Sequence, residues 1–79
     1  MFTNNMLVFI ENARLIGIEH GWRSTLNISD ITKTIYVNFI GSSSHYYIGS
    51  ISASFDEINQ TETPIHLALK LINDLLYDL

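Results

Sequence analysis

The sequence predicts a single α+β domain with the element order α-β-β-β-α, in which an antiparallel three-stranded meander sheet lies between an N-terminal and a C-terminal helix. Two observations predict this class. Apolar residues recur at helical spacing near both ends of the chain, and at every second position in the middle, from Ser24 to about Phe55. Short polar segments separate these runs. With 79 residues, the chain is expected to be one small domain, residues 1–79.

The first helix is expected to follow Thr3, an acceptable N-cap, and to run to about residue 20. Gly21 then occupies the position after a helix end that favours glycine. An alternative interpretation divides the segment into two strands, MLVFI and RLIGI, but the ENA between them contains no glycine for a tight turn. The predicted core side of the helix consists of Met6, Phe9, Ile10, Ala13 and Ile16.

The opposite side of this helix is also apolar, which is unusual for a surface helix. One small domain cannot readily bury both sides of such a helix, and a chain without cysteine has no disulfides to compensate for a small core. We therefore expect a homo-oligomer, most simply a homodimer, whose packing residues on this helix are Leu7, Leu15 and Ile18.

Two strands are expected at residues 24–29 and 34–40, joined by a turn at Asp30–Lys33. This turn pairs Ser29 with Thr34. The residues that would then share the core face are Leu26, Ile28, Ile35 and Val37.

The stretch GSSSHYYIGS, residues 41–50, is interpreted as a hairpin with a five-residue connection at 41–45. In this register Ile40 lies opposite Tyr46 and Phe39 opposite Tyr47. Gly49 is expected where a helix or core residue approaches the sheet backbone closely. A catalytic serine would need an oriented base and oxyanion donors, which adjacent loop residues do not supply, so we expect no catalytic residues here.

The third strand is expected to end at about Phe55, and residues 56–62 are interpreted as a polar connection. The last helix is predicted from Thr63 as N-cap and Pro64 at the first helical position. This helix is apolar around much of its circumference, so one sheet face is not expected to bury all of its apolar residues. Its apolar residues are Ile65, Leu67, Ala68, Leu69, Leu71, Ile72, Leu75, Leu76 and Leu79.

Composition excludes several functions. Eight acidic and four basic residues give a net charge of −4, which disfavours direct binding to nucleic-acid phosphates. No apolar run is long enough to cross a membrane, and no signal peptide is recognisable at the N-terminus, so a cytoplasmic protein is expected. The histidines His20, His45 and His66 lack the compact spacing of metal ligands, and no metal or cofactor is expected.

Two surfaces are candidates for partner contact. The outward face of the sheet is predicted to gather Tyr36, Asn38, Ile40, Tyr46 and Ile48, a composition typical of interfaces. The alternative is that these cross-strand pairs only stabilise the sheet, and the face would become core if the first helix covered it. A second set, the acidic residues of the connection, could imitate a row of phosphates or could simply be solvated: Asp56, Glu57 and Glu62.

The element order is similar to that of double-stranded-RNA-binding domains. Their basic stretch at the start of the last helix has no counterpart in TPIHLALKLINDLL, where Lys70 is the one cation, so RNA binding is not expected. The order, small size and acidic balance also resemble some anti-CRISPR proteins, which are phage-encoded inhibitors of bacterial defence nucleases. That resemblance implies a phage or mobile-element protein that binds a host protein, and the Ile- and Asn-rich, Lys-poor composition is compatible with such a source.

We therefore expect a non-enzymatic protein-interaction module, in its most specific form an inhibitor or regulator of a host protein. Two alternatives remain open. The protein could be an acidic mimic of nucleic acid that blocks the groove of a nuclease or polymerase. It could also be a small enzyme or ligand-binding subunit whose site is completed across an oligomer interface, using His45 and Tyr46.

Overall fold

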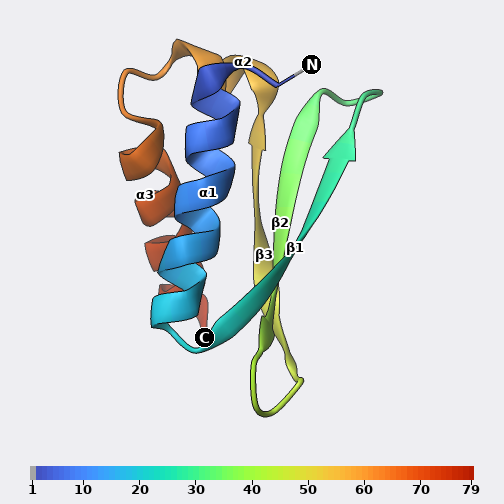
Figure 1. Cartoon of the computed structure of the whole chain (residues 1–79), viewed down its shortest axis with the longest axis vertical. Coiled ribbons are helices and arrows are strands. Elements are labelled where there is room, and N and C mark those ends of the chain that lie inside the picture. The colour runs from blue at the N-terminus through green and yellow to red at the C-terminus, as the bar shows by residue number, and fades with distance from the viewer. Residues whose placement is uncertain (1) are drawn as a thin grey trace.

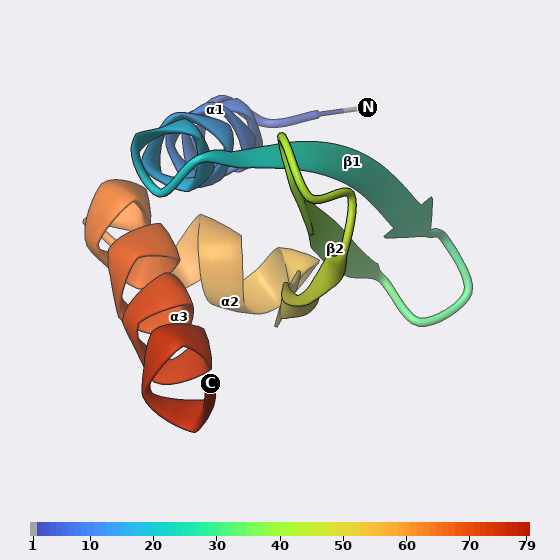
Figure 2. The ribbon, with the colours of Figure 1, turned by 90° about the horizontal axis from the view of Figure 1, so that it is seen from below.

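The computed structural model describes residues 2–79 and has the predicted α+β arrangement, with three helices on one side of a three-stranded antiparallel sheet (Figures 1 and 2). The strands are hydrogen-bonded in the order β1-β2-β3. One helix, α2, was not expected. In chain order the elements are α1 (Asn4–Glu19), β1 (Trp22–Ser29), β2 (Thr34–Gly41), β3 (Tyr47–Ser54), α2 (Phe55–Gln60) and α3 (Pro64–Asp78).

Helix α1 begins and ends as its sequence predicts. The Thr3 hydroxyl accepts a hydrogen bond from the amide of Met6 at 3.2 Å, which satisfies one of the free N–H groups of the first turn. Gly21 has φ +78°, in the left-handed region that favours glycine. The alternative of two strands is excluded. Of the predicted core side, Met6, Phe9 and Ala13 are buried, and Ile10 and Ile16 are half-buried against the core.

The register of β1 with β2 is the predicted one, with Ser29 opposite Thr34. Leu26 lies on the core face of this pair as expected, but it remains 45% exposed. It lies on an edge strand, and β1 diverges from α1 along its length (Figure 1). The helix layer therefore covers this edge of the sheet incompletely.

The register of β2 with β3 differs from the prediction by two residues. Phe39 pairs with Gly49, and not with Tyr47, and an irregularity follows between Phe39 and Ile40. The connection is residues 42–46 because Gly41 stays in the sheet, where its N–H donates to the carbonyl of Tyr46 at 2.9 Å. Because the shift is two residues, Gly49, Ile51 and Ala53 of β3 keep the core face. Tyr47, predicted opposite Phe39, instead lies opposite Ile40 on the outer face.

Both long helices pack on the same face of the sheet. A Cβ added to Gly17 of α1 would lie 2.8 Å from the Phe39 ring, and one added to Gly49 would lie 2.5 Å from Leu75 of α3. Phe39 and Gly49 are paired neighbours, so α1 and α3 cover adjoining parts of one surface. The predicted close approach at Gly49 is confirmed, and the outer sheet face is left without a helix (Figure 2).

Residues 55–60 form helix α2 and are not a simple polar connection. Ser54 is its N-cap and accepts a hydrogen bond from the amide of Glu57 at 3.0 Å. Because Ser54 caps this helix, Phe55 starts α2 and does not extend β3. Ile58 of α2 is fully buried. The predicted N-cap of α3 is only partly right, because Pro64 holds the first position but the Thr63 side chain makes no capping hydrogen bond.

The side-chain amide of Asn5 joins α1 to the α2–α3 segment. Its Nδ2 donates to the carbonyl of Ile58 at 3.1 Å and to that of Thr61 at 3.0 Å. The Thr3 hydroxyl adds a hydrogen bond to the Asn59 side chain. The N-terminal end of α1 is thus held by polar contacts as well as by its buried face. No helix within residues 2–79 combines the length and apolar character that a bilayer crossing requires.

Candidate functional site

The side of α1 turned away from the sheet is apolar and open to solvent. Leu7, Leu15 and Ile18 are 51%, 43% and 52% exposed, and at 3.6 residues per turn they share one face. We call these three residues the outer helix surface. Helix α3 also leaves Ile65 and Leu69, one turn apart, exposed. The excess apolar character that the sequence indicated is therefore present on the surface of the folded chain.

One ion pair lies on α1 among these residues. Arg14 Nη2 donates to Glu11 Oε1 at 2.7 Å. This hydrogen bond, with the charge of Arg14, lowers the pKa of Glu11 below its ordinary 4.5, and the same contact raises the pKa of Arg14. Both side chains are about half exposed, so the pair contributes little to stability. Its charges cancel, and the outer helix surface is nearly neutral.

The outer face of the sheet gathers part of the predicted set. Tyr36, Asn38 and Ile40 alternate along β2 with buried residues and are themselves half-buried. Tyr46 lies in the connection and is 76% exposed. Ile48 has no residue opposite it, because Ile40 pairs with Tyr47 and Phe39 with Gly49.

Ile48 is also half-buried and packs against the core. The irregularity in the sheet thus removes Ile48 from the predicted patch. We call Tyr36, Asn38 and Ile40, with Tyr47 opposite Ile40 on β3, the outer sheet surface. Tyr46, which was predicted to lie opposite Ile40, is in the connection before β3.

The serine-rich connection is stabilised by hydrogen bonds between its own residues. The Ser44 hydroxyl accepts a hydrogen bond from the Tyr46 amide at 3.3 Å, and His45 has φ +60° with its amide donating to the carbonyl of Gly41. The nearest polar side-chain contact of His45 is Arg23 Nη2, 3.4 Å from Nδ1. Within residues 2–79 no serine–histidine hydrogen bond is present, and the contacts of Ser44 are those of a hairpin loop.

The three acidic residues of the segment predicted as a connection are exposed, but they do not all lie in the same element. Asp56 and Glu57 lie in the first turn of α2, and Glu62 follows that helix. Carboxylates at a helix N-terminus interact favourably with its dipole, which gives the first two a structural role. Across residues 2–79, histidine and acidic side chains nowhere gather in the threes that could hold a metal ion.

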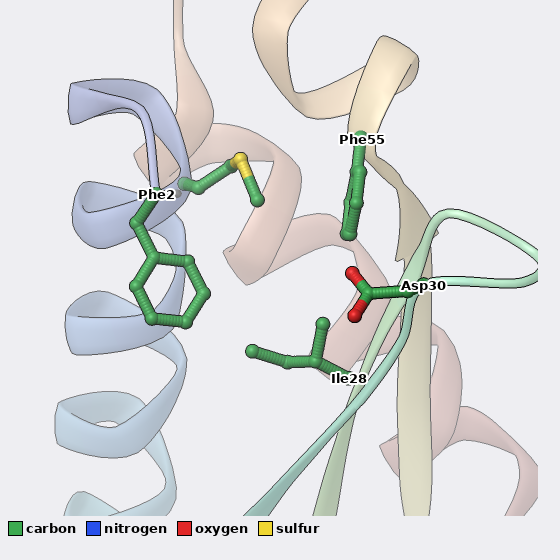
Figure 3. A pocket seen from close by; sticks show the side chains of 5 residues that line it. Phe2, Ile28, Asp30 and Phe55 are labelled. Carbon is green, nitrogen blue, oxygen red and sulfur yellow. The ribbon is translucent and has the colours of Figure 1, made fainter.

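A pocket that sequence reasoning missed lies where the start of α1, the end of β1 and the start of α2 meet (Figure 3). Its volume is about 280 Å³. The sequence did contain one signal, since Ser54 and Glu57 have the spacing of a capping box and would have moved Phe55 into a helix. The pocket is lined by Phe2, Met6, Ile28, Asp30 and Phe55.

Comparison with protein-family models, with curated proteins and with solved structures returns no match for this chain. The structure itself defines a small α+β domain whose helices and sheet each leave a surface uncovered.

Proposed function

We propose that this protein is a non-enzymatic protein-interaction module that self-associates through the outer helix surface and holds a different protein on the outer sheet surface. The observation that supports this most is the exposure of 43–52% of each large aliphatic side chain of the outer helix surface. Burying such a side chain completely is worth about 1.5–3 kcal/mol. A second chain packed against α1 would gain a substantial part of this energy.

A second copy of the chain is the occupant that we propose for the outer helix surface. A two-fold pair brings identical patches together, and a neutral apolar patch meets its own copy without charge repulsion. A stable interface buries about 800 Å² per partner of the 5119 Å² exposed by one chain. Three side chains cannot supply that area alone, so the proposed interface extends to Ile65 and Leu69 of α3.

The outer sheet surface is proposed to contact a protein of another kind. It offers two tyrosines, which are enriched among the residues that dominate interface energetics. In the most specific form of the proposal, the protein is a phage or mobile-element inhibitor that acts on a host protein. The small size, the net charge of −4 and the helix–sheet–helix order support this form. A nucleic-acid mimic has less support because Asp56 and Glu57 serve the start of α2.

The test is quantitative affinity capture from a bacterial lysate with four tagged proteins compared by mass spectrometry. The wild type is compared with Tyr36→Ser/Tyr47→Ser on the sheet and Leu15→Glu/Ile18→Glu on α1. Tyr77→Ser is the matched control, because Tyr77 is 91% exposed and lies outside both surfaces.

The proposal predicts a captured protein that the wild type and Tyr77→Ser enrich equally and the sheet variant loses. The α1 variant should lose the untagged copy of the chain when both are co-expressed. Equal capture of every protein by all four baits would contradict the proposed surfaces.

A further inference from the structure

The pocket beside the N-terminal end of α1 combines apolar side chains with the carboxylate of Asp30. Phe2, Met6, Ile28 and Phe55 supply aromatic, thioether and aliphatic surface. Met6 is buried, whereas Phe2 is 42% exposed. Figure 3 shows the Asp30 carboxylate directed into the space between these side chains. Among residues 2–79, Asp30 is the one titratable residue that lines the pocket.

The Asp30 carboxylate has no partner within residues 2–79. No hydrogen bond engages its oxygens, and the ion pairs of the described chain are Glu11 with Arg14 and Lys70 with Asp74. Lys33, the nearest cation in sequence, belongs to the same turn but makes no ion pair with it. Asp30 is exposed at the mouth of the turn, so its carboxylate is free to pair with a cation that enters the pocket.

These features select a particular kind of ligand. A cation complements the carboxylate, and phenyl faces attract cations through their quadrupole. An apolar stem can pack along Met6 and Ile28 as the aliphatic parts of long basic side chains do elsewhere. An anion would meet Asp30, and a neutral apolar ligand would leave the carboxylate unpaired. The volume of about 280 Å³ is below the range for drug-sized ligands, about 300–1,000 Å³, and suits one side chain.

We propose that this pocket binds an alkylguanidinium group, as at the end of an arginine side chain. A guanidinium is preferred to an ammonium because it is planar, can lie against a phenyl ring and can present two N–H donors to one carboxylate. The site is separate from the outer helix and outer sheet surfaces, so it stands or falls independently of the proposed function.

The test is an NMR titration of the full chain with n-butylguanidinium at millimolar concentration, followed by the methyl signals of Met6 and Ile28. The wild type is compared with Asp30→Asn and with Asp78→Asn, which removes the same charge at the end of α3. That end lies at the opposite end of the molecule from the N-terminus (Figure 1). The amide spectra report whether each variant is folded. Further arms use n-butylammonium, n-butanol and a capped arginine amide.

The proposal predicts saturable shifts confined to the pocket, with affinity for n-butylguanidinium about fivefold weaker in Asp30→Asn, as expected for loss of one exposed charge pair. Asp78→Asn should bind like the wild type, and n-butylammonium should bind more weakly. Binding of the capped arginine assigns the site to a protein side chain, and its failure assigns it to a free guanidine. Absence of shifts, equal binding of n-butanol, or equal weakening by Asp78→Asn would overturn the proposal.

Discussion

The two sides of α1 carry apolar residues in similar number but meet different surroundings. Toward the sheet, Phe9 and Ala13 are fully buried and Gly17 lies against the Phe39 ring. Away from the sheet, Leu15 and Ile18 remain about half exposed. Ala13 and Gly17 let the inner side approach the sheet closely, whereas no part of the chain within residues 2–79 covers Leu15 and Ile18 on the outer side. The burial of this helix is therefore limited by the area of one sheet face and not by a shortage of apolar residues.

The largest expected loss of stability comes from removing a buried side chain on the inner side of α1. Phe9→Ala should lower the free energy of unfolding by about 3–5 kcal/mol, because the 0% exposed ring leaves a cavity in the core. Leu15→Ala on the outer side, measured at a protein concentration where the chain is monomeric, should cost less than about 1 kcal/mol. Urea denaturation followed by circular dichroism measures both, and equal losses would remove the distinction between the two sides.

A second test enlarges the inner side. Gly17→Val should destabilise the protein by about 1–3 kcal/mol through overpacking, because a Cβ there would lie 2.8 Å from the Phe39 ring. Combining it with Phe39→Leu should recover part of this loss. Ile18→Val, the adjacent control on the outer side, should be nearly neutral in the same urea titration. A Gly17→Val variant as stable as the wild type would show that the contact is not close.

A smaller effect is expected from the polar contacts that hold the N-terminal end of α1. Asn5→Ala removes donors from the carbonyls of Ile58 and Thr61 and should cost about 1–2 kcal/mol. Faster hydrogen exchange of α2 amides should accompany it. Asn4→Ala, at the exposed neighbouring position, is the control and should leave both properties close to those of the wild type. Slow exchange in α2 of Asn5→Ala would argue against this role.

The smallest expected effect concerns the ion pair on the outer side. The pKa of Glu11 is lowered by its hydrogen bond with Arg14, so the pair stabilises the protein above the ordinary pKa of 4.5 and this contribution is lost as pH falls through the lowered value. Glu11→Gln should therefore be slightly less stable than the wild type near neutral pH and equally stable in strong acid. Thermal unfolding across this pH range measures the difference, and a difference independent of pH would contradict the sign.

Periodicity located α1, α3 and the β1–β2 pairing because each depends on local spacing and one short turn. The predicted register of β3 was wrong by two residues because Gly41 pairs with Trp22 of β1 and so extends β2. The local sequence pattern does not indicate this contact. Helix α2 was missed because its polar composition outweighed the capping signal at Ser54.

One candidate site could likewise be predicted from local sequence patterns, and another could not. The exposure of Leu7 and Ile18 follows from helical periodicity on a chain with one sheet. The pocket does not, because Phe2, Asp30 and Phe55 come from three segments that only the tertiary fold brings together.

The central claim is that a second polypeptide covers the outer helix surface, and sedimentation velocity over a range of protein concentrations tests it most directly. The account predicts a species of twice the chain mass of 9.0 kDa for the wild type, and the single-chain mass for Leu15→Glu/Ile18→Glu with its secondary structure intact. A wild-type protein that sediments as a single chain at every concentration would contradict it.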